Sequence, residues 1–236
     1  MTKTIYDSSV IAQKPPFRFE KEMVKPIISY LPTVFELQTG QRARLLREQP
    51  VGSVIPDLMF GIWTGELPRF NGLNPVSRQM LAWLSTEKKV LTEQHLRDEL
   101  FLSERAAGNA VTVLQRVGAI SKRSSGELEL RPEFNPSDSL FLIAIEMKLK
   151  RWREALAQAI HYRSFANESY VALDGNQFEV NATVRGMFVS SGVGLFIQTK
   201  NEIVKAIPAQ MTFPEPSVDR LLAVSKFASN GPYCFA

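Results

Sequence analysis

Residues 140–162 of the 236-residue chain read LFLIAIEMKLKRWREALAQAIHY and carry its clearest structural pattern. Its first part is an unbroken apolar run up to Ile145, which is typical of a strand buried on both faces of a sheet. The run ends in Glu146-Met147-Lys148, and the residues that follow have the spacing of a basic amphipathic helix. A buried strand followed directly by a helix predicts an α/β fold.

The charged residues at the end of this strand need an explanation. Residues two apart in a strand point to the same face, so Glu146 and Lys148 are expected to project together. Burying a charge costs several kcal/mol unless the charge is paired or bound to a metal. The two residues are therefore either an ion pair at the strand end or part of a site.

A third charged residue lies in a similar setting. Asp57 follows Pro56 in VIPDLMFG, within a predicted strand at residues 53–63 that follows a predicted strand at 42–48 and a turn at Gly52. Carboxylates that converge from neighbouring strands supply the hard oxygen ligands that Mg²⁺ prefers. A lysine beside them would orient or help to deprotonate an attacking water, and the metal would stabilise charge on a phosphate.

Between residues 74 and 134 the sequence shows a series of predicted helices followed by a predicted hairpin. Asn74, Thr92 and Ser103 are placed to cap three successive helices, the last of which ends at Gly118. The segments AISKR and ELELRPEF then alternate around the turn SSG, which predicts a β-hairpin. Three helices followed by a hairpin is the order of a winged helix-turn-helix, and the segment resembles that family by layout over about 60 residues.

The remaining elements are distributed on both sides of this segment. Residues 17–31 have helical spacing, with Pro26 as a predicted kink. Strands are expected at 169–174, 192–199 and 202–208, and a last helix is expected from Ser217. We therefore predict one discontinuous α/β domain, residues 1–65 and 135–236, with a second domain inserted at 66–134.

The combination of VIPDLMFG with IAIEMKLKRWREALAQAIHY resembles the PD-(D/E)XK nuclease superfamily, which includes restriction endonucleases and Holliday-junction resolvases. In that family a mixed sheet is flanked by helices, the first carboxylate comes from the second core strand, and the ExK pair comes from the next strand. The helix that follows often carries a QAxxY-like pattern, which here is Gln158-Ala159 with Tyr162.

The resemblance implies a role for each matching residue. Asp57 and Glu146 would be metal ligands, Lys148 the base that handles water, and Gln158 a supporting polar residue, while Tyr162 is expected to serve in packing. The family's N-terminal helix often adds a glutamate near the metal. Glu20 fits that position best, and Glu22 stays an alternative. The implied cofactor is Mg²⁺ or Mn²⁺.

The chain departs from the family in one respect. Between Asp57 and Glu146 lie 88 residues (146 minus 57 is 89, less one), where ordinary members have a short hairpin. The winged segment occupies this gap, so the two halves of the core must meet across an insertion. Insertions at exposed turns carry a small entropic cost, so this arrangement is tolerable.

Basic residues suggest where a nucleic acid would lie. Lys150, Arg151 and Arg153 follow the ExK pair and would contact backbone phosphates, although a solvated helix face explains them equally well. In the predicted wing, Lys122 and Arg123 are the corresponding residues. The segment from 74 to 134 has nine Lys and Arg against eight Asp and Glu, so DNA contact and a protein-docking or homodimer contact both stay open.

Composition limits the class of protein. The net charge of +4 is compatible with a polyanionic partner but does not require one. Cys234 is the single cysteine, which excludes an internal disulfide and a cysteine zinc cluster. No apolar run approaches the roughly 20 residues of a membrane helix, and the N-terminus lacks the apolar region of a secretory signal. We therefore expect a cytoplasmic protein without a membrane partner.

These observations together predict a metal-dependent nuclease, a Mg²⁺-dependent endodeoxyribonuclease in its simplest form, with the winged helix as a targeting or docking module. The alternative is a nuclease-like DNA-binding or protein-interaction module that has lost turnover. A transcription-factor-like regulator is a third hypothesis, against which the near-neutral winged segment counts. The choice between DNA and RNA, and between endonuclease and exonuclease action, is open at this level.

Overall fold

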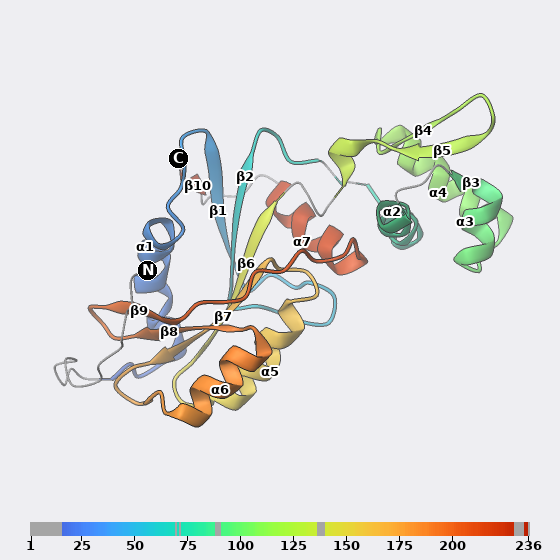
Figure 1. Cartoon of the computed structure of the whole chain (residues 1–236). Coiled ribbons are helices and arrows are strands. Elements are labelled where there is room, and N and C mark those ends of the chain that lie inside the picture. Colours follow the sequence, from blue (N-terminus) through green and yellow to red (C-terminus); the bar gives the residue numbers. More distant parts are fainter. Residues whose placement is uncertain are drawn as a thin grey trace.

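The structure is a computed structural model, and it describes residues 16–68, 70, 72–87, 91–135, 140–228 and 234–235. The outermost residues of the predicted domain ranges, and residues 136–139 at one junction, lie outside the described part. Figure 1 shows a large twisted sheet with helices packed against it and a smaller group of helices and short strands at one end.

A seven-stranded sheet forms the larger part of the molecule, in the order β10-β1-β2-β6-β7-β8-β9 (Figure 1). Its strands are β1 (Gln41–Arg47), β2 (Leu58–Thr64), β6 (Phe141–Lys148), β7 (Glu168–Asp174), β8 (Gly194–Gln198), β9 (Ile203–Ile207) and β10 (Cys234–Phe235). β2 pairs directly with β6, so strands from before and after the middle of the sequence lie side by side.

The sheet is mixed in direction. β1, β2 and β6 pair antiparallel, β6, β7 and β8 pair parallel, and β9 returns antiparallel to β8. Parallel neighbours need a crossover connection, and these are provided by α5 (Trp152–Tyr162) and α6 (Ala182–Ser191). The predicted α/β class, with a mixed sheet flanked by helices, is confirmed.

Helices cover both faces of the sheet. On one face α1 (Val24–Val34) and the residues before it bury apolar side chains against the strands, Ile27 and Leu31 among them. On the other face lie α5, α6 and α7 (Val218–Ala228). The strands therefore have two buried faces, which explains why β6 and β7 are apolar almost throughout.

The alternation of side chains in β6 positions its charged end. Ile143, Ile145 and Met147 belong to the core under α1, while Leu142 and Ala144 belong to the core on the α5 side. Glu146 and Lys148 continue the second set, because residues two apart in a strand face the same way. Their side chains consequently lie on the face that α5 covers.

A smaller unit is built between β2 and β6. It contains α2 (Pro75–Glu87), α3 (Glu93–Glu99), α4 (Glu104–Arg116) and a three-stranded sheet in the order β3-β5-β4. The strands are β3 (Leu91–Thr92), β4 (Ile120–Lys122) and β5 (Glu127–Leu130). β4 and β5 pair antiparallel, which confirms the predicted hairpin.

The predicted helix caps of this unit are also confirmed. The Asn74 side chain accepts a hydrogen bond from Ser77 N at 2.8 Å. The side chains of Thr92 and Ser103 accept from backbone N–H groups three residues ahead, which satisfies donors that have no partner within the helix.

The smaller unit also contacts the large sheet through a helix from the end of the chain. α2 packs against α7, and Thr86 Oγ1 donates to the Pro216 carbonyl oxygen at 3.1 Å. The buried apolar side chains form one continuous cluster from the large sheet into the unit. The unit is thus held by packing as well as by its two chain connections.

Two predicted elements differ from the structure, and one helix of the structure was not predicted. The single helix expected at 17–31 is wrong: a short 3₁₀ helix (Glu20–Glu22) precedes α1, which begins at Val24. Pro26 thereby falls in the first turn of α1, where a missing N–H costs nothing. The strand expected at 53–63 begins only at Leu58, after a turn closed by a Val51–Val54 bridge. α6 was not predicted at all.

Candidate functional site

Asp57 joins the ends of β2 and β6. It lies one residue before β2 rather than inside the strand, and its Oδ2 accepts a hydrogen bond from Met147 N at 2.7 Å. The last register pair of these strands is Leu58 with Ile145, so the carboxylate continues the ladder where backbone pairing stops. Asp57 is held at the end of β6 in this way, beside Glu146.

Glu146 is the most buried charged group of the site, with 2% of its surface exposed. Its Oε1 accepts from Lys148 Nζ at 2.6 Å, and its Oε2 accepts from the Tyr162 hydroxyl at 2.6 Å. Lys148 comes from the same strand face and Tyr162 from α5, which crosses that face. Both carboxylate oxygens are therefore hydrogen-bonded, as a buried charge requires.

A third carboxylate approaches from the N-terminal segment. Glu20 Oε2 lies 3.8 Å from Lys148 Nζ. Glu22, the alternative to Glu20, is engaged differently, because its Oε2 accepts from Arg18 N at 3.1 Å. The glutamate that the structure brings to Lys148 is therefore Glu20, and it comes from the 3₁₀ helix that precedes α1.

The electrostatics reflect this crowding of carboxylates. Burial and the negative charge of Glu146 raise the pKa of Asp57 to about 6, against the lowering effects of the Met147 N–H and Lys148. Burial lowers the pKa of Lys148, but its hydrogen bond to Glu146 and the surrounding carboxylates outweigh that effect and raise it above the usual value. At neutral pH Lys148 is a cation in this arrangement.

Tyr162 is the residue whose role the sequence reasoning missed. It was expected to serve in packing, and it is buried, but its hydroxyl also donates to Glu146. Burial and that hydrogen bond raise the pKa of Tyr162, so it keeps its proton and acts as a donor. The signal was the four-residue spacing from Gln158, which places both on one face of α5.

Gln158 lies one turn before Tyr162 on that face. Its Oε1 is buried, and no hydrogen-bond partner for it is found within the described part of the chain. A buried amide oxygen of this kind has a free acceptor. The structure therefore places Gln158 on the correct side of the sheet but does not connect it to Asp57, Glu146 or Lys148 by a hydrogen bond among the described residues.

The predicted phosphate-binding residues near the site are exposed but partly engaged. Arg151 Nη1 pairs with Glu154 at 2.9 Å, and the Arg153 guanidinium lies over the Trp152 ring at 4.4 Å. Lys150, directly before them, is exposed. These contacts are on the surface, so water and salt weaken them and the side chains are readily available to other partners.

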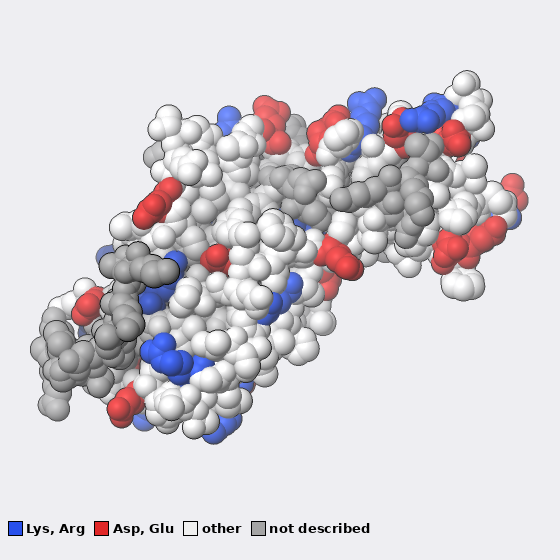
Figure 2. All heavy atoms as spheres, viewed as in Figure 1, with Lys and Arg blue, Asp and Glu red and all other residues white. Residues whose placement is uncertain are grey.

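The wing residues differ from one another. Arg123 makes two contacts with the Glu129 carboxylate, at 3.1 and 3.0 Å, whereas Lys122 is exposed on β4. On the face seen in Figure 2, Lys and Arg side chains of the described residues are scattered among Asp and Glu and form no continuous basic patch. The smaller unit therefore lacks a basic stripe on the face in view.

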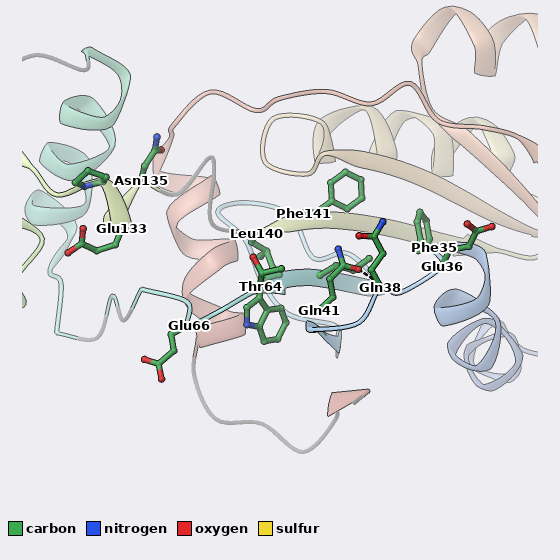
Figure 3. Close-up of a pocket in the computed structure, with 13 residues that line it drawn as sticks. Phe35, Glu36, Gln38, Gln41, Thr64, Glu66, Glu133, Asn135, Leu140 and Phe141 are labelled. Carbon is green, nitrogen blue, oxygen red and sulfur yellow. Dashed lines mark hydrogen bonds between the residues drawn. The ribbon is translucent and has the colours of Figure 1, made fainter.

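A cavity in the larger part of the molecule does not contain the predicted site residues. It has a volume of about 640 Å³ and lies at the other end of β2 and β6, where Gln41, Thr64 and Phe141 line it (Figure 3). Glu36 and Glu66 also border it. Asp57, just before β2, and Lys148, at the end of β6, both lie at the end of this strand pair that is distant from the cavity. The cavity and the carboxylate cluster are therefore separate features.

Among the described residues, no three His, Cys, Asp or Glu side chains are grouped so that they would hold a metal ion by themselves. Nor does any helix in the described part of the chain have the length and apolar character to cross a bilayer.

Comparisons with protein-family models, curated proteins and solved structures found no match to this chain.

Proposed function

We propose that the protein is a metal-dependent nuclease that hydrolyses phosphodiester bonds in DNA. The observation that carries the proposal is the convergence of Asp57 and Glu146 from two neighbouring strands, with the Lys148 ammonium against Glu146. Glu146 is buried and Asp57 is half-buried, and two carboxylates so close that one raises the pKa of the other are costly unless they serve a purpose. Binding a divalent cation is such a purpose.

The donor set fits Mg²⁺ or Mn²⁺ in its chemistry. Oδ1 of Asp57 accepts no hydrogen bond from the described residues, and Glu146 and Glu20 present further carboxylate oxygens. Mg²⁺ is commonly bound through one or two carboxylates, with waters and substrate phosphate oxygens completing its shell. The described residues contain no group of three such ligands, which is compatible with this mode of binding. The cation, when bound, would stabilise negative charge on the phosphate.

Each residue of the cluster would then have its own role in the reaction. Asp57 and Glu146 hold the cation, with Glu20 as a further acceptor at the edge. Tyr162 fixes the orientation of Glu146 through its hydroxyl. Lys148 is protonated, so we assign it as a donor that orients the attacking water and neutralises the phosphate, in place of the base that the family resemblance implied.

The finer architecture is proposed on the same grounds. The strand order, with Asp57 before one strand and the ExK pair at the end of its neighbour, supports a restriction-endonuclease-like core of the PD-(D/E)XK kind. Three helices and a β-hairpin with capped helix starts support an inserted winged helix, used for targeting or docking. DNA and a cytoplasmic location are proposals that accompany this assignment.

One observation favours the alternative, a nuclease-like binding module without turnover. Both oxygens of Glu146 are already used by Lys148 and Tyr162, so a cation must share them or displace Lys148. An ion pair that had replaced the metal permanently would have the same geometry. Direct measurement of metal binding separates the two functions.

The test is cleavage of plasmid, linear, single-stranded and branched DNA with Mg²⁺ or Mn²⁺, together with calorimetric Mn²⁺ titration. Lys148→Ala is expected to lose most cleavage and keep Mn²⁺ binding, because the carboxylates remain, while Glu146→Gln is expected to lose both. Lys25→Ala, an exposed lysine on α1, which covers the other face of the sheet, is the matched control and should cleave within about threefold of wild type.

If the wild type cleaves none of these substrates with either metal, the nuclease proposal fails and the binding module replaces it. Cleavage by Lys148→Ala at the wild-type rate would instead show that the lysine has no part in the chemistry.

A further inference from the structure

An exposed aromatic ring lies next to the carboxylate cluster. Phe19 is 57% exposed, although most large apolar residues of the described chain are buried. It directly precedes Glu20, whose carboxylate reaches Lys148. Ile55 is 58% exposed and lies two residues before Asp57. Two exposed apolar side chains therefore border the site, from the N-terminal segment and from the turn before β2.

The segment that carries Phe19 is held in place. Phe17 N donates to the buried carboxylate of Asp174 at 3.0 Å, and Gln177 Nε2 donates to the Phe17 carbonyl oxygen at 3.3 Å. Beyond Phe19 the 3₁₀ helix begins, and Met23 is completely buried under the sheet. The ring is thus presented from a backbone that is fixed on both sides, which lowers the entropic cost of a contact.

Positive charge accompanies the ring. Lys21 Nζ lies over the Phe19 ring at 5.2 Å from its centre, and Lys150 is exposed just beyond the end of β6. Single-stranded nucleic acids are bound by this combination, in which an aromatic face stacks on a base and cations take the phosphates. An apolar protein partner would not need the cations, and a duplex would not use the ring, since its bases are stacked on both sides.

We propose that Phe19 is a stacking platform for an unpaired DNA base beside the phosphate that is cut, with Lys21 as the adjoining phosphate contact. The substrate class is accordingly single-stranded DNA, or a duplex with frayed or flapped strands. This inference rests on the proposed nuclease function for its location, but the stacking contact itself is measurable without cleavage.

The experiment measures binding in EDTA and cleavage with Mn²⁺, using a single strand that carries 2-aminopurine at successive positions and the matched duplex. Phe19→Leu keeps the apolar volume but removes the stacking face, and Phe19→Trp restores one. Phe213→Ala is the control, because Phe213 is 79% exposed and follows Thr212, which bonds to Asn167 at the opposite end of β7.

The expected results differ between the substrates. Phe19→Leu should weaken single-strand binding by about tenfold, since stacking on an aromatic ring is worth roughly 5- to 150-fold per base. It should also remove the 2-aminopurine quenching seen at one position with wild type. Phe19→Trp should keep both the single-strand affinity and the quenching, and Phe213→Ala should change neither of these. Duplex binding should change less than about twofold in every variant.

Equal single-strand binding and quenching by wild type and Phe19→Leu would overturn the platform, even if the wild type cleaves DNA. Equal losses on single strand and duplex would also overturn it. If the wild type shows the Phe19-dependent quenching but cleaves nothing, the platform stands and the nuclease proposal fails.

Discussion

Tyr162 contributes to the site through Glu146. Its hydroxyl supplies one of the two hydrogen bonds that the Glu146 carboxylate accepts at 2% exposure. A residue that hydrogen-bonds to a metal ligand usually sets the orientation and basicity of that ligand. Changing such a residue typically reduces metal affinity or activity by about 10- to 100-fold. Under the proposed function, α5 therefore contributes through a side chain that the family resemblance assigned to packing.

Tyr162→Phe is expected to weaken Mn²⁺ binding by about tenfold or more and to lower the free energy of unfolding by roughly 1.5–3 kcal/mol, the range for a hydrogen bond to a charged group. Calorimetry and chemical denaturation measure the two effects. Tyr170→Phe is the matched control, since the buried Tyr170 hydroxyl donates to Glu168 at 2.9 Å on the other face of the sheet. It should affect stability only, and a metal effect as large in Tyr170→Phe would contradict the role of Tyr162.

The stability of the metal-free protein should depend on the ionisation of Asp57. Its pKa is about 6 in the folded protein, whereas an unperturbed aspartate titrates near pH 3.9. A raised pKa means that folding favours the protonated form of Asp57. The contribution of this carboxyl to the free energy of unfolding is therefore fully present below about pH 4, and it is lost as pH rises to about 6. Because the carboxyl is only partly buried, solvent screening reduces the loss to about 1 kcal/mol.

Thermal unfolding between pH 4 and pH 7 without divalent metal tests this dependence. Relative to wild type, Asp57→Asn should be stabilised as pH rises through this range, since its amide does not ionise. Mn²⁺ should raise the wild-type melting temperature at pH 7 and leave that of Asp57→Asn nearly unchanged. Parallel pH profiles of the two proteins would show that Asp57 ionises with an ordinary pKa.

Among the elements, β6 and α5 were predictable because their patterns are long and unambiguous. A continuous apolar run of strand length followed by helical spacing leaves few alternatives, and both elements are found close to the predicted residues. α6 was missed because it buries only Val184 and Phe188 and leaves other apolar side chains exposed, so no helical stripe is visible in the sequence. Its Asn181 cap and Gly192 terminus were the signals available.

The 3₁₀ helix shows why the site could not be completed from sequence. Spacing favoured Glu20 but left Glu22 open; the structure anchors the segment before both residues through the hydrogen bond from Phe17 N to Asp174, 157 residues away. In the same way Asp57 was assigned to a strand, whereas its side chain replaces a backbone partner at the strand end. Long-range hydrogen bonds decided both cases, and periodicity carries no information about them.

The anchor itself is testable. Asp174→Asn removes one acceptor of the Phe17 N–H, and an unsatisfied buried donor costs about 1–3 kcal/mol of unfolding free energy. We also expect Mn²⁺ affinity to fall as much as in Glu20→Ala, because the segment no longer holds Glu20 near Lys148. The double variant should then lose no more metal affinity than Glu20→Ala alone. Additive losses would show that Asp174 does not act through Glu20.

At the scale of the whole molecule, the smaller unit lies at one end and the carboxylate cluster at the end of β6 distant from it (Figure 1). Any contribution of the wing to DNA binding should therefore be separable from the chemistry. Arg123 is already paired with Glu129, whereas Lys122 is exposed. The exposed Lys122 is the better candidate for a phosphate contact.

Lys122→Ala should weaken DNA association and reduce the salt dependence of log K by about 0.9, the value for one phosphate contact, without changing the single-turnover cleavage rate. Arg123→Ala should have a smaller effect on binding. Fluorescence anisotropy across a series of salt concentrations measures the slopes. An unchanged slope in Lys122→Ala would favour protein docking as the role of the unit.

The order of the strands also has a consequence for synthesis of the chain. β2 pairs on one side with β1, which precedes it, and on the other with β6, which follows only after 76 further residues, 65–140. During synthesis on the ribosome, the apolar edge of β2 therefore has no β6 partner while the residues of the smaller unit are being translated. Such an edge is prone to pair with other chains. The nascent protein should consequently depend on early folding of the helical unit, or on a chaperone, until β6 arrives.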